Sequence, residues 1–333
     1  MVTTNELISI QGLTKKYGDK VALDSLDLSI PSGQILGLIG PNGAGKTTTI
    51  KILVGLARPT SGTAHVAGVD CVRNAKKIKR MVGYMPDKFG SYENMRVLEY
   101  LDFFGAAFGL KRRDRRRRIE EVMEMSGTTY MRDMLVDSLS HGMSQRLGIT
   151  RTLLHDPQVL ILDEPANGLD PLARIEMREL LLKLADAGKT LLVTSHILPE
   201  LSRICHRIAI LAQGRLRACG NVAEISRQIS PRRTMEVQLS SEADVSQAAE
   251  VIRRHMEEEA EVVPAPTERL VRCRTLKSEA ELGELLATLV ASGIQVTQFR
   301  ELQTDLEEAF MTFARESAED VVPEASVPAE SEG

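Results

Sequence analysis

The sequence predicts an α/β fold built around a parallel sheet, and three short stretches carry this prediction. Residues 35–39 read Ile-Leu-Gly-Leu-Ile, an unbroken apolar run that leads into a glycine-rich turn. Residues 159–162 form a second all-apolar run, which ends in two acidic residues, and residues 190–195 form a third strand-like run. Continuous apolar runs of this length are typical of central parallel strands, because both faces of such a sheet are covered.

The turn after the first strand is the most informative stretch of the chain. It fits Gly-x-x-x-x-Gly-Lys-Thr, a loop that surrounds the phosphates of a bound nucleotide. Glycines allow the sharp turn that brings several backbone N–H groups close to phosphate oxygens. A helix expected over residues 46–56 directs its positive end toward the same anion. The residues expected to bind the nucleotide here are Gly40, Pro41, Asn42, Gly43, Ala44, Gly45, Lys46, Thr47 and Thr48.

Two side chains of this loop have specific expected roles. Lys46 supplies a full positive charge for the terminal phosphates, and the Thr47 hydroxyl can bind Mg²⁺. The alternative is a chance glycine-rich turn between a strand and a helix, but strand, loop and helix all occur in the order that the motif requires. The sequence therefore predicts a protein that binds a nucleoside triphosphate.

The acidic pair after the second strand suggests hydrolysis. Asp163 is placed to hold Mg²⁺, and Glu164 is then the natural base for an attacking water. Two acids at this point could instead cap the next helix. The polar turn at Ala166–Asp170 and the strand over residues 190–195, which brings His196 to the same edge of the sheet, favour the catalytic interpretation.

Residues 139–146 read Leu-Ser-His-Gly-Met-Ser-Gln-Arg and begin a helical stretch that continues to Leu154. With this motif the chain resembles the ATP-binding subunits of ABC transporters over residues 5–225. The matching motifs, in their usual order, are the phosphate loop at Gly40–Thr47, the signature at Leu139–Gln145, Asp163-Glu164, the loop at Ala166–Asp170, and His196.

The resemblance implies a P-loop NTPase (RecA-like) core with a β-subdomain and a helical subdomain at about residues 88–155. It implies that Tyr17 stacks on adenine, where the alternative is an ordinary exposed tyrosine, and that Asp170 belongs to the nucleotide site. It also implies a head-to-tail dimer, in which the signature of one subunit meets the ATP of the other. Ser140 and the Gly142 amide at a helix start suit such a second anion site, which one chain cannot fold back onto its own phosphate loop.

Two positions depart from the usual pattern of that family. His141 stands where the signature usually has glycine, and its ring either points to solvent, which we favour, or lies close to a triphosphate. Asp87 follows a strand-like stretch, where the family commonly has glutamine. Its oxygens could still bind Mg²⁺, but its negative charge near the terminal phosphate would slow hydrolysis or alter coupling. The alternative is that Asp87 only caps the following segment.

The composition of the chain excludes several classes of protein. The chain has 333 residues, 43% of them hydrophobic, which allows two domains with substantial cores. A formal net charge of −4 argues against a generic nucleic-acid binder. No apolar run approaches the roughly 20 residues that span a bilayer, the N-terminal residues lack the features of a signal peptide, and the 4 cysteines show no metal-ligand spacing. We expect a cytoplasmic protein that is peripheral on the inner face of the cell membrane through separate multi-span permease subunits, with no nucleic-acid partner.

The segment over residues 93–135 is expected to be helical and contains a strongly basic run. Residues 111–118 carry seven cations in eight positions. Cations at a helix start oppose the helix dipole, so we expect the first turn to fray. The run could contact anionic lipid headgroups or an acidic partner, although a solvated helix start is the interpretation we favour.

The chain changes character after Gly220. Strand-like and helical patterns alternate in the order β-α-β-β-α-β, which is the ferredoxin-like order. We expect a C-terminal accessory α+β domain over residues 231–314, which ends in a helix at Asp305–Ala314. Residues 315–333 contain six acidic residues and two prolines, so this tail is expected to be disordered.

Proteins with several different functions contain an ATP-binding domain of this kind. The accessory domain and the stretch Asp305–Phe310 resemble the exporter branch often called ABC-2 type. Soluble relatives in DNA repair insert a long coiled coil, for which the 93 residues between Lys46 and Ser140 leave no room. Tandem translation factors need two phosphate loops, and a regulator without turnover would lack Glu164. The prediction is therefore an ATP-hydrolysing, Mg²⁺-dependent transport subunit; the alternative is a soluble ABC-type ATPase acting as a regulatory or nucleic-acid-associated factor.

Overall fold

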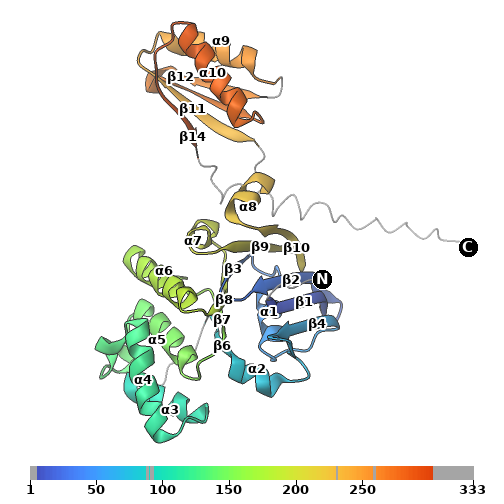
Figure 1. Ribbon diagram of the computed structural model, residues 1–333, viewed down its shortest axis with the longest axis vertical. Coiled ribbons are helices and arrows are strands. Elements are labelled where there is room, and N and C mark those ends of the chain that lie inside the picture. The colour runs from blue at the N-terminus through green and yellow to red at the C-terminus, as the bar shows by residue number, and fades with distance from the viewer. Residues whose placement is uncertain (1–5, 88–89, 91–93, 230–231, 258–259, 303–333) are drawn as a thin grey trace, which may run out of the picture. The chain divides into compact units, whose positions relative to one another are not determined.

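A computed structural model of the chain describes residues 6–87, 90, 94–229, 232–257 and 260–302 (Figure 1). The chain divides into two compact units, with the division after Val222. The helix expected at Asp305–Ala314 and the acidic tail lie outside the described residues.

Unit 1 contains two sheets that enclose a common core. The smaller sheet is antiparallel and has four strands in the order β2-β1-β4-β5. Its strands are β1 (Glu6–Tyr17), β2 (Lys20–Pro31), β4 (Ser61–Val66) and β5 (Val69–Asp70). Alternate residues of β1 and β2 are buried, as expected for a sheet with one face covered. This sheet corresponds to the β-subdomain that the family resemblance implies.

The larger sheet has six strands in the order β10-β9-β3-β8-β7-β6. Its strands are β3 (Ile35–Ile39), β6 (Val82–Met85), β7 (Val159–Asp163), β8 (Thr190–Ser195), β9 (Arg207–Ala212) and β10 (Arg215–Gly220). All neighbours are parallel except β9 and β10. Every residue of β3, β7 and β8 is buried, which confirms that the three apolar runs are central parallel strands.

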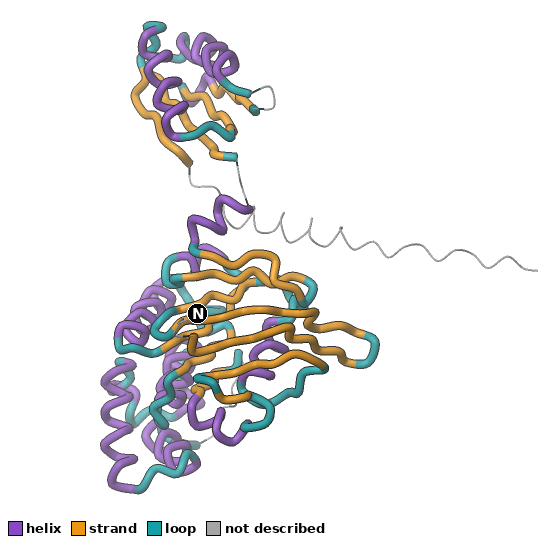
Figure 2. The backbone as a smooth tube through the Cα atoms, turned by 45° about the vertical axis from the view of Figure 1, so that its right-hand side comes forward, coloured by secondary structure: helices purple, strands orange, loops and turns teal. Residues whose placement is uncertain are grey.

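Helices cover both faces of the larger sheet, as Figures 1 and 2 show. Helix α1 (Lys46–Leu53) lies between the two sheets and contributes to the same hydrophobic cluster as both. The opposite side carries α5 (His141–Leu153), α6 (Pro171–Asp186) and α7 (Leu198–Ser202). This is the α/β architecture of a P-loop NTPase core, as predicted.

The first helix is shorter than the sequence indicated. We expected helix to residue 56, but α1 ends at Leu53. Gly55 adopts φ 71°, and the Leu56 N–H donates to the Lys51 carbonyl at 2.7 Å. A left-handed glycine with such a bond is a common way for a helix to end.

The helical part of unit 1 comprises several short elements. They are α2 (Ala75–Met81), α3 (Val97–Ala107), α4 (Arg112–Ser126), η1 (Thr129–Met131) and η2 (Val136–Ser138). Gly109, with φ 85°, separates α3 from α4. The expected fraying at the basic helix start is not observed, because α4 is formed from Arg112 and Arg115 anchors its first turn to Asp102 of α3.

Unit 2 is a four-stranded antiparallel sheet with two helices. Helix α8 (Val222–Ile229) precedes it, and its elements are β11 (Arg233–Leu239), α9 (Asp244–His255), β12 (Glu261–Ala265), η3 (Pro266–Glu268), β13 (Leu270–Thr275), α10 (Glu279–Ala291) and β14 (Val296–Leu302). The strand order β12-β13-β11-β14 is that of a split βαβ fold. The core combines residues of α9 and α10 with those of the sheet.

Candidate nucleotide-binding and catalytic site

The phosphate loop follows β3 and depends on its glycines. Gly45 adopts φ 111° directly before α1, a conformation that L side chains rarely adopt. A Cβ at Gly40 would lie 2.3 Å from the Leu211 carbonyl oxygen, so only glycine fits. The loop is also held by a hydrogen bond of 2.9 Å that the Gly214 N–H donates to the Ala44 carbonyl. The motif spacing therefore reflects close backbone packing as well as phosphate recognition.

Lys46 begins α1 and is 7% exposed. Its ammonium donates to the Gly40 carbonyl at 2.5 Å and lies 3.9 Å from a Glu164 oxygen. Burial lowers the pKa of Lys46, whereas the charges of Glu164 and Asp163 act to raise it. A buried ammonium with two nearby carboxylates joins the phosphate loop to the end of β7.

A pocket of about 260 Å³ opens above the loop. Its lining contains Pro41 to Thr48 and also Tyr17, whose stacking on adenine stays a prediction. Tyr17 is 48% exposed, and the Lys15 ammonium lies 4.7 Å from its ring centroid. Lys20 and Ala22 also line the pocket and were not predicted. They lie beside Tyr17 because β2 begins directly after β1 and pairs with it in the antiparallel direction.

The two acids at the end of β7 are held by one residue of the neighbouring strand. The Thr194 hydroxyl donates to Asp163 at 2.7 Å and accepts from the Glu164 N–H at 2.9 Å. Asp163 and Thr194 are partners in the parallel register of β7 and β8. Sequence reasoning missed Thr194, although the register of two adjacent parallel strands could have indicated it.

Glu164 has an unusual backbone and a fixed side chain. Its φ of 53° lies in the left-handed region, which costs a non-glycine residue roughly 1–2 kcal/mol. One carboxylate oxygen lies 3.0 Å from Nδ1 of His196, and the other faces Lys46. His196 thus reaches the same edge of the sheet, as predicted. Strain of this kind is characteristic of residues held for function.

The electrostatics around Asp163 are unfavourable for a negative charge. Burial raises the pKa of Asp163, and the nearby Asp87 carboxylate raises it further, while the Thr194 hydrogen bond and Lys46 oppose this. Burial also raises the pKa of Tyr84 to about 12, with smaller contributions from the same two aspartates. Asp87 therefore lies close enough to Asp163 for their charges to interact.

The signature begins α5 with a well-formed cap. The Ser140 hydroxyl accepts from the Met143 N–H at 3.3 Å, as is typical of an N-cap. A Cβ at Gly142 would lie 3.2 Å from the Ala173 Cβ of α6, so the starts of α5 and α6 are in contact. Neither Ser140 nor Gly142 lines the phosphate-loop pocket.

The His141 ring is exposed, but the prediction that it only points to solvent is wrong, because the ring makes a hydrogen bond. Its Nε2 lies 2.8 Å from the Asn167 carbonyl oxygen. Because a carbonyl can only accept, Nε2 must carry the hydrogen. In the same turn, Asp170 caps α6 by accepting from the Ala173 N–H at 2.9 Å. The predicted role of Asp170 toward a nucleotide remains a prediction, since this residue also lies outside the pocket lining.

A glycine-rich loop around a buried lysine, next to a strand that ends in two acids, defines a P-loop nucleotide-binding protein. The sequence profile described as "ABC transporter" matches residues 23–167. The bacitracin transport ATP-binding protein BcrA of Bacillus licheniformis is 34% identical over 306 residues, which are 92% of this chain and 96% of that protein. The chain belongs to the family of ABC transporter ATP-binding subunits.

Two further relatives have related names. The Nod factor export ATP-binding protein I of Cupriavidus metallidurans is 39% identical over 66% of this chain and 72% of that protein. The probable multidrug ABC transporter ATP-binding protein YbhF of Escherichia coli is 38% identical over 69% of this chain, but the match spans only 40% of YbhF.

Solved structures support the same fold. An ATP-binding subunit of an ABC transporter has a TM-score of 0.60 and 31% identity, covering 67% of this chain and 92% of that one. A bacterial ABC transporter cassette described as dimeric has a TM-score of 0.59 and 26% identity, covering 65% and 98%. Within the described residues, no helix is both long and apolar enough to span a membrane.

Proposed function

We propose that this chain is the ATP-binding and ATP-hydrolysing subunit that powers an ABC exporter. The arrangement of Glu164 is the observation that carries the proposal. Its carboxylate is fixed between His196 and Lys46, directly after the buried Asp163 and beside the phosphate loop. The names of the relatives, which mention Nod factor export and bacitracin transport, support the transport of a substrate by the whole complex.

The oxygen donors of this site fit Mg²⁺. Asp163 presents a buried carboxylate whose pKa is raised mainly by burial, so a nearby cation would favour its charged form. Thr47 and Asp87 offer further oxygens, and Mg²⁺ in nucleotide sites usually combines one or two carboxylates with phosphate oxygens and water. When bound, Mg²⁺ would neutralise charge that develops on the phosphates.

Each residue then has a distinct task. The loop amides and Lys46 bind the β- and γ-phosphates, and Tyr17 provides a flat apolar surface for adenine. Glu164 accepts the proton of the attacking water, and His196 holds its carboxylate in place. Thr194 fixes the positions of both acids relative to each other.

The second anion site at Ser140 and Gly142 belongs, in this proposal, to the nucleotide of another subunit. That subunit is a second copy of the chain or a related ATP-binding subunit, arranged head to tail. The observation that supports this is the absence of Ser140 and Gly142 from the pocket lining described above. Separate permease subunits would carry the substrate, and the chain would act at the cytoplasmic face of the membrane beside them.

Replacing Glu164 with glutamine tests the assignment of the base. Glutamine keeps the shape of the side chain but does not accept a proton, so kcat should fall by about 10²- to 10⁴-fold. ATP affinity should stay within a few-fold of the parent value, measured with a fluorescent ATP analogue. Hydrolysis by Glu164→Gln at the parent rate would exclude Glu164 as the base.

A further inference from the structure

His141, the first residue of α5, has an exposed ring that is nevertheless held by the turn before α6. Its Nε2 lies 2.8 Å from the Asn167 carbonyl oxygen and donates to it. The ring also lies against Gly168, where a Cβ would be 3.3 Å from Nε2 and 3.5 Å from Cδ2. Gly168 adopts φ 70°, so glycine suits the backbone of this turn and also leaves room for the ring. The imidazole therefore bridges the start of one helix and the turn before another.

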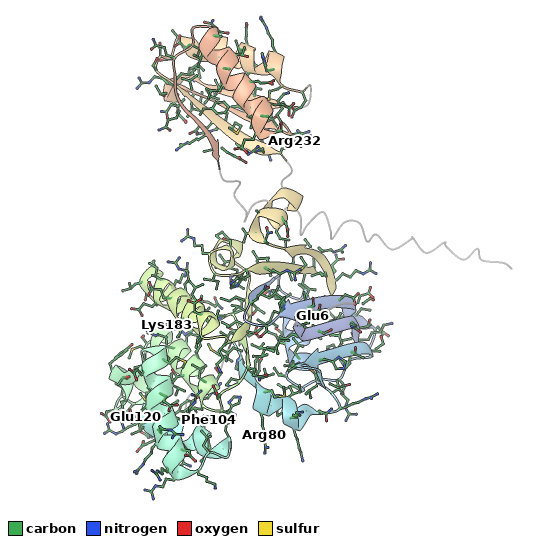
Figure 3. The ribbon with its side chains drawn as sticks, in the orientation of Figure 1. Glu6, Arg80, Phe104, Glu120, Lys183 and Arg232 are labelled. Carbon is green, nitrogen blue, oxygen red and sulfur yellow. The ribbon has the colours of Figure 1, made fainter. Side chains whose placement is uncertain are left out.

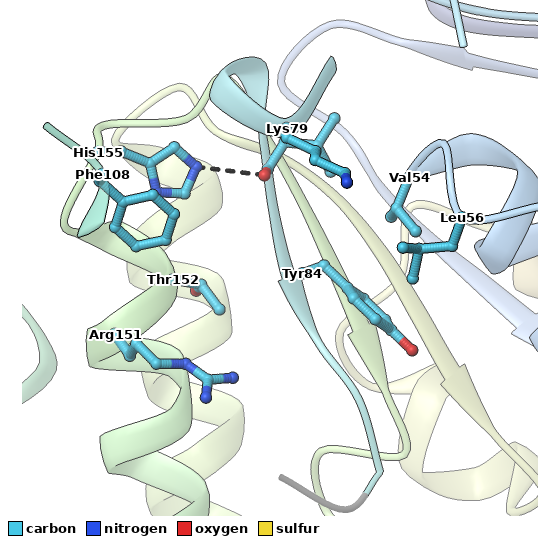
Figure 4. Close-up of a pocket in the computed structure, with 9 residues that line it drawn as sticks. Val54, Leu56, Lys79, Tyr84, Phe108, Arg151, Thr152 and His155 are labelled. Carbon is cyan, nitrogen blue, oxygen red and sulfur yellow. Dashed lines mark hydrogen bonds between the residues drawn. The ribbon is translucent and has the colours of Figure 1, made fainter. Parts of the chain in front are cut away.

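The rest of α5 is anchored to parts of unit 1 that do not include this turn. Just past its C-terminal end, His155 Nε2 lies 3.2 Å from the Val82 carbonyl of β6, as the dashed line in Figure 4 shows. Near its middle, Arg146 donates to Glu176 of α6 at 2.7 Å. Lys183, labelled in Figure 3, lies further along α6, away from the signature. These contacts fix the middle and the C-terminal end of α5, so the orientation of its first turn depends on contacts of its own.

The turn that holds His141 is itself tied to the catalytic end of β7. The Asn167 N–H donates to the Glu164 carbonyl at 3.1 Å, and the Glu164 N–H donates to Thr194 at 2.9 Å. At its other end the turn is closed by Asp170, which caps α6. Since the turn is fixed at both ends, a ring bonded to its middle is bonded to a firm support.

The part of the signature that His141 holds contains the donors suited to phosphate. The Ser140 hydroxyl accepts from the Met143 N–H at 3.3 Å, so its own hydrogen is available to another acceptor. The N–H groups of His141 and Gly142 lie in the first turn of α5, where backbone donors have no acceptor within the helix. A rotation of this turn would redirect these donors together.

We propose that His141 is a positioning residue, which fastens the signature to the turn before α6 and so orients Ser140 and the Gly142 N–H toward the nucleotide of a second subunit. This inference rests on the proposed function, in which the signature meets that nucleotide. The ring acts through Nε2–H, which is used by the Asn167 carbonyl, and not through a direct contact with phosphate. Removing this donor should loosen the signature and leave the phosphate loop of the same chain unchanged.

ATP-driven dimerisation of the full chain tests this inference. The background variant is Glu164→Gln, in which ATP should persist during sedimentation velocity runs with Mg²⁺. In this background, His141→Leu should raise the dimer dissociation constant about tenfold, because each of two signatures loses roughly threefold in the population of its correct orientation. Binding of a fluorescent ATP analogue to the monomeric chain should not change.

The matched control is His141→Gln in the same background. The glutamine Nε2 carries hydrogen and can donate to the Asn167 carbonyl in place of the ring, so the dimer dissociation constant should stay within about twofold of the background value. An equal loss in the leucine and glutamine variants would overturn the inference, because the ring itself would then contact the nucleotide. Both variants should melt within about 4 °C of the background, and a larger drop for leucine would assign its effect to the fold instead.

The same experiment separates this inference from the proposed function. Dimerisation of His141→Leu as strong as that of the background would overturn the positioning role alone. A background variant that stays monomeric at saturating ATP would overturn the proposed head-to-tail dimer, and the positioning role with it.

Discussion

The phosphate loop and the signature are both helix starts that we propose to bind phosphate, but their surroundings in the structure differ. The loop before α1 lies in a pocket with Tyr17, and its lysine contacts the acid at the end of β7. The signature before α5 has no part in that pocket. Its contacts lead to the turn before α6, through the His141–Asn167 hydrogen bond of 2.8 Å and the packing of Gly142 on Ala173.

This difference suggests that the phosphate loop and the signature have different roles. In our proposal the phosphate loop binds a nucleotide with residues of its own chain, because strand β3, the glycine turn and α1 already orient the amides and the ammonium. The signature is preorganised equally well, with Ser140 capping α5, yet it lies outside that pocket. The comparison therefore predicts separable effects: changes near the loop should affect binding and chemistry within a chain, whereas changes in the signature should act on another chain.

The largest effect on binding is expected for Lys46→Ala. This variant removes a charge-assisted contact to phosphate, which is worth about 1.5–3 kcal/mol, so the dissociation constant for ATP should rise about ten- to a hundredfold. Lys51→Ala, on the exposed face of the same helix, is the matched control and should bind within about twofold of the parent. Unchanged binding by Lys46→Ala in a fluorescent ATP titration would mean that the loop has been misassigned.

A smaller effect is expected for Thr194→Val. The variant keeps the shape of a fully buried side chain but removes the hydroxyl that joins Asp163 to the Glu164 N–H. We expect kcat to fall about tenfold, and an unsatisfied buried N–H costs about 1–3 kcal/mol of stability. Thr194→Ser retains the hydroxyl and should stay near the parent rate. If the valine and serine variants hydrolyse ATP equally well, the bridge has no role in positioning the acids.

Sequence reasoning identified the loop because its chemistry is local. The motif at Gly40–Thr47 specifies close backbone turns within eight residues, and the strand before it is recognisable from its apolar run. The three central strands and the acids at the end of β7 could be predicted for the same reason. Each depends on residues that are neighbours along the chain.

Features that depend on contacts between distant parts of the sequence could not be predicted in this way. Thr194 is 31 residues from Asp163, and His141 is 26 residues from Asn167, so neither pair forms a motif. The left-handed backbone of Glu164 could not be predicted either, because no local sequence pattern marks it and its N–H is held by Thr194, 30 residues away.

The smallest effect is expected for Asp87→Gln. The Asp87 carboxylate raises the pKa of Asp163 after the larger effect of burial, which shows that the two like charges interact. Removing one charge while keeping an oxygen should raise basal turnover about two- to fivefold, and stimulation by a permease in lipid should fall. Asp87→Ala, which lacks the oxygen, should not show the increase. Equal basal rates and equal stimulation in parent and glutamine variant would leave Asp87 as a capping residue.

The division between loop and signature can be tested most directly by mixing two inactive variants. Lys46→Ala damages only the loop and Ser140→Ala only the signature, so each alone should hydrolyse ATP very slowly. In a head-to-tail dimer of one subunit of each kind, one site contains both defects and the other contains none. The equimolar mixture should therefore recover about a quarter of the parent ATPase rate. A mixture that stays as inactive as its components would contradict the claim that each site is shared between two copies of this chain.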